Sequence, residues 1–253
     1  MKQSLILSAI FFGLTSCSDT GSGPVKYVNP YIGNISHLLV PTYPTVHIPN
    51  SMVRFYPNRE NFTSSYMQGF PLNVVSHRSG KVFNLSPLIG DIVGIKGNIL
   101  YSYDNEKITP FSYSVTLDEP DISVQFIPAE KSGFFSFSFS KDSARYVILK
   151  TTDQGELEYE NNTISGYDTY DGIKAFLCLE FDRAPDAVRA MERDVLSARS
   201  SVSGSRVALV ASFGAGGNGE INIRYGLSYI SVEQAERNLQ AGIPGWTGAR
   251  LPA

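Results

Sequence analysis

The sequence predicts an all-β protein, an antiparallel β-sandwich with one short helix near its C-terminus. Apolar and polar residues alternate in several short runs, most clearly in Phe135-Ser136-Phe137-Ser138-Phe139, and a period of two is typical of half-buried strands. Proline, glycine and asparagine interrupt these runs at short intervals, as turns between antiparallel strands require. Aromatic residues, which strands favour, make up 12% of the chain.

The first residues are typical of an export signal. A positive start, Met1-Lys2-Gln3, precedes the apolar run Ser4–Leu14, which is too short to span a bilayer. Leu14-Thr15-Ser16-Cys17 resembles a lipobox, so residues 1–16 are expected to be a lipoprotein signal peptide and Cys17 the lipidated first residue. The alternative is an ordinary secretory signal. Residues 17–24 form a small polar tether, and several acyl chains on Cys17 would anchor the protein stably. The expected location is therefore the bacterial outer membrane, either on its periplasmic face or at the cell surface.

The stretch from Tyr27 to Asp91 is dense in proline, asparagine, glycine, histidine and tyrosine. Ordering such a segment costs about 1–2 kcal/mol of backbone entropy per residue. Long irregular segments in compact domains are usually functional or disordered, and the recurring apolar residues argue against disorder. We therefore expect an ordered loop system that shapes a binding site.

Beyond this stretch, the pattern predicts a series of short strands. Asn161-Asn162 is a hairpin turn signal between two of them. The polar segment 182–205 is expected to be irregular, with Ala187–Leu196 as one helical excursion. The expected strands are Ser112–Leu117, Ile122–Ile127, Phe135–Phe139, Tyr146–Leu149, Glu156–Glu160, Thr163–Tyr167, Lys174–Phe181, Arg206–Phe213 and Glu220–Tyr229.

The single clear helix signal follows the last strand. Ser231 and Gln234 are spaced as a capping box, which predicts a helix that reaches Gln240 and stops at Gly242 and Pro244. The sandwich should therefore occupy residues 25–230, and residues 231–253 should hold the helix and a linker.

Charge and cysteine content exclude several classes of protein. The net charge of −3 makes nucleic acid an unlikely partner. Cys178 lies in the apolar run Ala175–Leu179, where a buried and inert thiol is expected, so a disulfide with Cys17 is improbable. Gly214–Gly219 lacks the Lys-Ser/Thr of a phosphate-binding loop and is read as a flexible hairpin.

Acidic side chains and histidines are the candidates for chemistry. Strand-edge carboxylates are usually solvated, and Asx-turn chemistry explains the pair Asp168 and Asp171 more simply than a cation loop does. The histidines lie in the opening stretch without the spacing of a zinc site. The acidic cluster of the 153–160 hairpin is Asp153, Glu156, Glu158 and Glu160, and the histidines are His37, His47 and His77.

Several motifs, in order, resemble glycoside hydrolase family 92, the bacterial exo-acting α-mannosidases. The resemblance runs from about Val25 to Trp246, and three departures from it (one histidine, His37, in the first loop, Thr45 for a glycine, and Ser79 for a second histidine) indicate a divergent branch. The matching segments are Tyr27–Gly33 with the family's VNPFIG, Tyr43-Pro44-Thr45 with FPGA, Ile48–Val53 with PFGM, Tyr56-Pro57-Asn58 with SPD, Ser76-His77 with SHTHLSG, and Arg224–Ala235 with the segment closing the N-terminal domain.

The resemblance implies a galactose-mutarotase-like supersandwich that packs on a helical-barrel domain. It also implies a calcium-dependent inverting enzyme acting on mannose-containing glycans, with catalytic carboxylates and calcium ligands in the helical domain. The chain stops after the linker, which we read as a truncation, so no catalytic or metal-binding residue is assigned to it. His77, then His37 and Asn29, are expected to line the sugar site. The alternatives are a non-catalytic carbohydrate-binding surface lipoprotein and, more weakly, a structural one.

Overall fold

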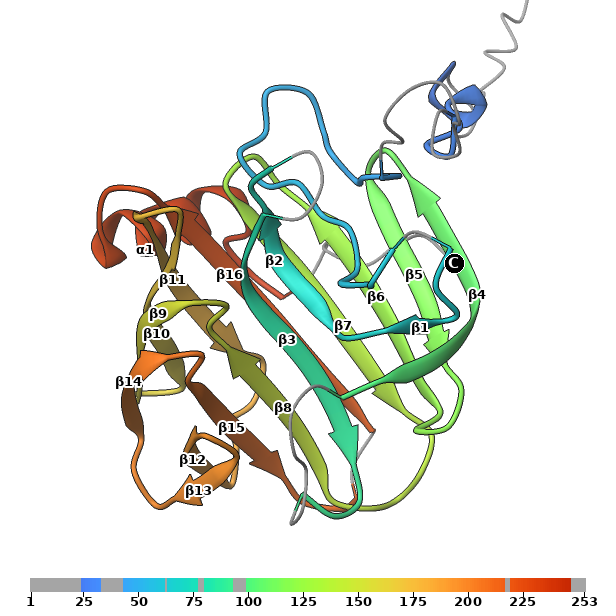
Figure 1. Ribbon diagram of the computed structural model, residues 1–253. Coiled ribbons are helices and arrows are strands. Elements are labelled where there is room, and N and C mark those ends of the chain that lie inside the picture. Colours follow the sequence, from blue (N-terminus) through green and yellow to red (C-terminus); the bar gives the residue numbers. More distant parts are fainter. Residues whose placement is uncertain are drawn as a thin grey trace, which may run out of the picture.

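The computed structural model describes residues 24–32, 43–61, 63–76, 80–92, 99–216 and 219–246, and these form two packed antiparallel sheets (Figure 1). The chain enters through a 3-10 turn at Pro24–Tyr27. The larger sheet holds, in spatial order, β1 (Tyr66–Met67), β4 (Tyr101–Thr109), β5 (Ser112–Leu117), β6 (Ile122–Pro128), β7 (Ser132–Phe139), β16 (Glu220–Ser228), β11 (Ile173–Phe181), β10 (Thr163–Tyr170), β9 (Gln154–Glu160) and β14 (Ser201–Ser205). The smaller holds β13 (Val195–Ser197), β12 (Ala187–Glu192), β15 (Ala208–Phe213), β8 (Arg145–Lys150), β3 (Lys81–Ile89) and β2 (Phe70–Val74).

This architecture confirms the predicted antiparallel sandwich. Each strand expected after residue 111 is present, and β5 has the predicted bounds, Ser112–Leu117. The predicted turn at Asn161-Asn162 joins β9 to β10, with φ of 50° and 64°. Positive φ at both central residues is the geometry of a type I′ hairpin turn, which asparagine tolerates better than most residues.

The helical excursion predicted at Ala187–Leu196 is wrong. This segment forms β12 and β13, which pair as a hairpin around Arg193 and Asp194, both at positive φ. β12 pairs along its length with β15, and its Ala190 is fully buried. Tertiary pairing has overridden the helix propensity of the Ala-Met-Glu-Arg run. The segment 182–205 as a whole is also not irregular, since it contains β14 as well.

The opening stretch contains more sheet than its composition predicted. β1, β2 and β3 all lie within Tyr27–Asp91, and prolines inside β2 and β3 obscured the strand signal. β2 is an edge strand, where a proline is tolerated. Pro87 lies in β3 beyond Leu85, after which β3 has no partner on its β2 side, so its missing N–H removes no ladder bond there.

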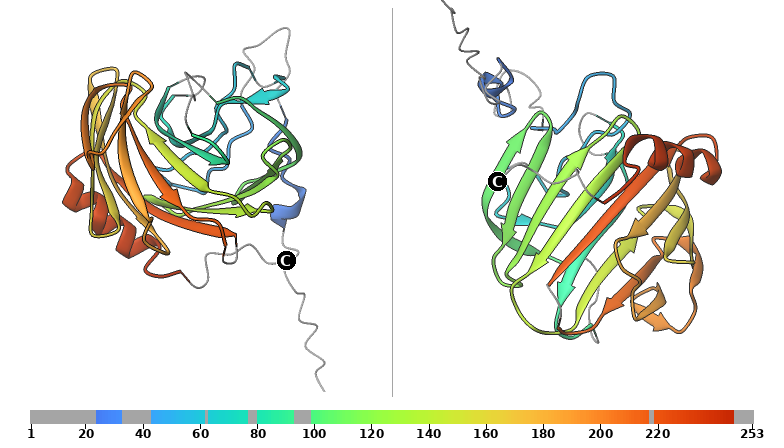
Figure 2. Two further views of the ribbon diagram at one scale, coloured as in Figure 1. Left: turned by 90° about the horizontal axis from the view of Figure 1, so that it is seen from below. Right: turned by 180° about the vertical axis from the view of Figure 1, so that it is seen from behind.

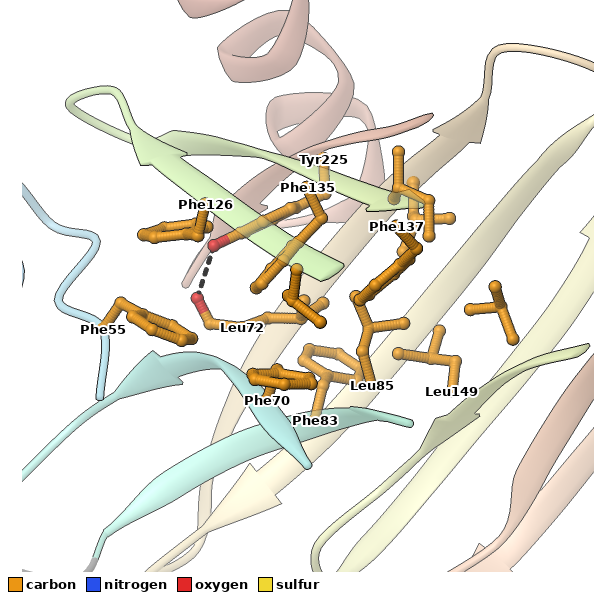
Figure 3. Close-up of a cluster of buried hydrophobic side chains, with 14 of the residues drawn as sticks. Phe55, Phe70, Leu72, Phe83, Leu85, Phe126, Phe135, Phe137, Leu149 and Tyr225 are labelled. Atoms are coloured by element: carbon orange, nitrogen blue, oxygen red, sulfur yellow. Dashed lines mark hydrogen bonds between the residues drawn. The ribbon is translucent and has the colours of Figure 1, made fainter. Parts of the chain in front are cut away.

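Aromatic rings from both sheets fill the core (Figure 3). Phe55 from the opening stretch contacts β6 and β7, with ring centroids 4.4 Å from Phe126 and 5.7 Å from Phe135. The buried Tyr225 of β16 crosses the core and donates a hydrogen bond of 2.7 Å to the Leu72 carbonyl of β2. Since this bond joins the two sheets, it fixes their relative position as well as satisfying two buried polar groups.

Helix α1 (Val232–Gly242) lies on the outer face of the larger sheet, away from the smaller sheet (Figure 2). The predicted cap is confirmed, because the Ser231 hydroxyl accepts a 3.2 Å hydrogen bond from Gln234 N. Ala235 and Leu239 are buried against the sheet. The close approach depends on Gly226, where a Cβ would lie 2.1 Å from the Ala235 carbonyl oxygen.

The segment that follows α1 is held to the sheet by Arg224. Its guanidinium donates to Glu180 at 2.6 Å and to the Ile243 carbonyl at 2.7 Å, and it lies 5.0 Å from the Trp246 ring centroid. The chain therefore leaves the sandwich in a defined direction. Within the described ranges, neither helix is long and apolar enough to cross a bilayer.

Candidate functional site

Strand ends from both sheets meet at one end of the sandwich. The end of β2 pairs with the start of β3 at Val74 and Lys81. In the larger sheet, β10 turns into β11 at Tyr170 and Ile173, and the end of β16 pairs beside that turn, with Ser228 opposite Phe176. Loops and strand ends can vary without disturbing the core, so this end is a natural place for a site.

A small open pocket of about 80 Å³ lies at this end, between β2, the start of β3 and the opening stretch. The rings of Tyr43 and Tyr56 stack on one another in its wall, with centroids 4.7 Å apart. Burial raises the pKa of Tyr56, and its buried hydroxyl finds no hydrogen-bond partner among the described residues. The pocket is lined by Tyr43, Tyr56, Pro57, Asn58, Arg59, Glu60, Pro71, Val74, Gly80 and Lys81.

Arg59 is the anchor of this wall. Its guanidinium pairs with the Glu106 carboxylate and lies over two aromatic rings, 5.3 Å from Tyr56 and 4.5 Å from Tyr103. Glu106 also accepts a 3.0 Å hydrogen bond from Tyr113. A register shift between Asp104 and Lys107 interrupts the pairing of β4 with β5 around Glu106. Bulges of this kind commonly redirect a side chain.

Lys81 and Asn58 supply polar groups beside the tyrosines. The Lys81 ammonium donates a hydrogen bond to the Asn58 side-chain oxygen, and burial lowers the pKa of Lys81. The backbone of Asn58 is itself fixed, because its N–H donates to the Gly69 carbonyl at 2.9 Å. An ammonium, an amide and stacked aromatic rings can together meet the hydroxyls and the apolar face of a sugar.

Asp168 differs from the solvated carboxylate that its sequence context predicted. It is fully buried within β10 and does not lie in the turn. Its Oδ2 accepts hydrogen bonds from Phe83 N at 2.7 Å and from Thr152 N at 2.8 Å, and its Oδ1 accepts from Thr169 N at 2.8 Å. Burial raises the pKa of Asp168, and the donated N–H bonds oppose this rise. The carboxylate ties β10 to β3 and is a structural group.

The remaining acidic candidates are exposed, as predicted. Glu156, Glu158 and Glu160 alternate along β9 on its solvent face, and Asp171 lies in the β10–β11 turn. Among the described residues there is also no group of three His, Cys, Asp or Glu side chains placed to hold a metal ion. The described part of the domain therefore does not fit a calcium site.

Most of the sequence-predicted site residues are not among those that the structure describes. His77, His37 and the lipidation candidate Cys17 lie outside the described residues. Asn29 is exposed, and its side-chain oxygen accepts a 2.9 Å hydrogen bond from Tyr31 N, so it shapes its own turn. His47 is exposed and hydrogen-bonds to the Ser51 carbonyl at 3.0 Å. Part of the predicted glycine-rich hairpin, residues 217–218, is also outside the described ranges.

Sequence reasoning missed Arg59, Lys81 and Glu106. The segment Tyr56-Pro57-Asn58 matches a family motif, and it lines the pocket. Arg59 follows it directly, so the motif was a usable signal for that residue. Lys81 and Glu106 come from strands that the pattern did not predict.

The fold defines a class: a domain of two packed antiparallel sheets with an open pocket at one end. The sequence profile of the Glycosyl hydrolase family 92 N-terminal domain matches residues 27–228. The chain therefore belongs to glycosyl hydrolase family 92, as its N-terminal domain. No curated protein sequence matches it significantly.

Solved structures share the fold at low sequence identity. The family GH92 inverting mannosidase BT2199 from Bacteroides thetaiotaomicron VPI-5482 superposes with a TM-score of 0.78 at 22% identity, over 89% of this chain and 34% of that one. The family GH92 α-mannosidase BT3965 from Bacteroides thetaiotaomicron gives 0.78 at 18% identity, over 88% of this chain and 35% of that one. The chain thus spans about a third of the length of these structures.

Proposed function

We propose that this chain is the sugar-facing, site-shaping domain of an inverting exo-α-mannosidase that acts on mannose-containing glycans. The observation that carries the proposal is the pocket of Tyr43, Tyr56, Asn58 and Lys81 in a domain of family 92. The two structural relatives are named as mannosidases, one of them inverting, which supports this substrate class.

We infer that the catalytic groups lie outside the described residues. Inverting hydrolysis needs a general acid and a general base on opposite sides of the scissile bond, about 6.5–9.5 Å apart. The buried carboxylate of this end, Asp168, is fully committed to N–H and O–H donors. We therefore propose that a helical-barrel domain packs on the sandwich and brings both carboxylates and the calcium ion.

The test is release of mannose from an α-mannobiose with calcium present. The chain by itself should show only the background rate, because groups that act as a unit fail as a unit. A protein that continues past residue 253 into a family 92 helical domain should release mannose. Activity of the chain alone would contradict the proposal that the catalytic groups lie in the helical domain. An inactive longer protein would contradict the substrate assignment.

A second candidate is a non-catalytic carbohydrate-binding lipoprotein. The same pocket favours it, since stacked tyrosines and the Lys81–Asn58 pair need no partner domain to bind a sugar. The two candidates predict different behaviour of the purified chain. A self-sufficient binding module should be monomeric and melt cooperatively, whereas a domain with an uncovered interface should self-associate. Sedimentation of the purified chain separates them.

Membrane anchoring through Cys17 is part of the same proposal. The apolar run ending in Leu14-Thr15-Ser16-Cys17 supports it. Cys17→Ser should move the protein from the membrane fraction to the soluble fraction of its host. Equal membrane association of the parent and the variant would contradict lipidation.

A further inference from the structure

Two further pockets lie beside the site pocket at the same end of the sandwich. The second pocket is lined by Lys81, Thr152, Asp153, Thr169, Tyr170 and Asp171. It shares Lys81 with the first pocket. The third is lined by Val75, Val82, Tyr170, Asp171, Ile173 and Tyr229, and shares Tyr170 and Asp171 with the second. The three pockets are therefore neighbours along this end of the sandwich, and we refer to them together as the groove.

The composition of the lining changes along this groove. The middle section is polar, with two threonines and two carboxylates beside the Lys81 ammonium. The far section, an open pocket of about 320 Å³, is apolar apart from Asp171 and the two tyrosine hydroxyls. Polar groups that meet hydroxyls, followed by aromatic rings that meet an apolar ring face, suit a chain of several sugar units.

Both tyrosines of the far section are held in place before any ligand binds. Tyr229, which follows β16, accepts a 3.3 Å hydrogen bond at its hydroxyl from Asn73, a buried residue of β2. Tyr170 packs on Gly80, where a Cβ would lie 2.5 Å from the tyrosine ring. Fixed rings lose little conformational entropy on binding, which favours ligand contact.

We propose that this groove binds an oligosaccharide, with the Tyr170–Tyr229 section as a second subsite beside the Tyr43–Tyr56 pocket. The inference rests on the proposed function, because it takes the first pocket as the sugar-facing site. It goes further by assigning the substrate class: an extended glycan is preferred over a free disaccharide, and Tyr229 sets that preference.

The experiment is calorimetric titration of the full chain with mannose, an α-mannobiose, an α-linked mannotetraose and maltotetraose. The mannotetraose should bind at least about tenfold more tightly than the mannobiose, the size expected of one aromatic stacking contact. Tyr229→Ala should remove this gain and leave mannobiose affinity unchanged. Ile173→Asp should do the same through an exposed turn residue whose substitution does not threaten the fold. Phe111→Ala, an exposed aromatic at the β4–β5 turn outside the three pockets, is the matched control and should keep the gain.

The outcomes separate this inference from the proposed function. Equal affinity for mannobiose and mannotetraose, or an unchanged gain in both Tyr229→Ala and Ile173→Asp, would overturn the second subsite alone. A similar gain for maltotetraose would support the groove and overturn the mannose assignment. Binding of none of the four sugars would overturn both.

Discussion

Replacing Asp168 with asparagine should destabilise the sandwich far more than the same replacement of an ordinary carboxylate near a surface turn. In the folded protein, Oδ2 accepts from Phe83 N, Thr152 N and Thr152 Oγ1, and Oδ1 accepts from Asp153 N and Thr169 N. An asparagine oxygen can replace one of these atoms, but its NH₂ group then faces N–H donors. If the oxygen takes the Oδ2 position, the N–H groups of Asp153 and Thr169 lose their acceptor.

The magnitude follows from these two donors. A buried polar group that is left without a partner costs about 1–3 kcal/mol, so Asp168→Asn should lose about 2–6 kcal/mol of unfolding free energy. For a domain of this size, that corresponds to a fall in melting temperature on the order of 10 °C. The Phe83 N–H makes the site especially sensitive, because Phe83 sits at φ 52° in an irregular part of β3.

Thermal melts followed by circular dichroism measure this effect. Asp171→Asn is the matched control: the chemical change is identical three residues away, at an exposed turn position with φ 50° that asparagine tolerates. It should change stability by no more than about 0.5 kcal/mol. Equal melting temperatures for the two variants would refute the structural role of Asp168.

Three further outcomes test helix docking, thiol burial and the pocket lysine. Gly226→Ala should lower stability by about 1–3 kcal/mol in a denaturant melt, because its Cβ would meet the α1 backbone, while Gly245→Ala, which has open space around it, should not. In a Cys17→Ser background, Cys178 should resist a thiol reagent at pH 8 until urea unfolds the chain, since burial raises its pKa to about 12; rapid reaction in the folded state would contradict this. Burial lowers the pKa of Lys81 below the ordinary 10.5. Just below pH 10.5 the unfolded chain therefore binds more protons than the folded chain, and stability rises with pH. The parent should gain stability relative to Lys81→Met as the pH rises toward 10.5, and a constant difference would argue against a buried ammonium.

The sequence was informative wherever local signals agreed with the fold. Alternation predicted β5, β6 and β7, and the Asn161-Asn162 turn was predicted because asparagine adopts positive φ readily. The Arg193-Asp194 turn has the same geometry, with φ of 47° and 64°, but lacks a typical turn sequence. Its hairpin was therefore predicted as helix.

The site was less predictable because its members are distant in sequence. Arg59 and Glu106 meet only after β4 has bulged and paired beside β5, and no local pattern encodes that bulge. Lys81 reaches Asn58 because β2 and β3 pair as a hairpin. The prolines in these two strands conceal the strand pattern in the sequence. Motif resemblance located the Tyr56-Pro57-Asn58 segment, but it could not show which side chains face the pocket.

The buried carboxylate and the proposed groove are physically connected. Thr152, Asp153 and Thr169 line the middle of the groove, and all three donate to Asp168. The Asp168 carboxylate therefore fixes the backbone of these three groove residues, and it also joins β10 to β3. A general acid or base must exchange its proton with substrate or water. Asp168 is fully buried and already accepts hydrogen bonds from N–H and O–H donors, so it could exchange a proton only by breaking the hydrogen bonds that position these groove residues. Asp168→Asn should consequently weaken mannotetraose binding even at temperatures where the variant is folded, whereas Asp168 has no route to act in catalysis itself.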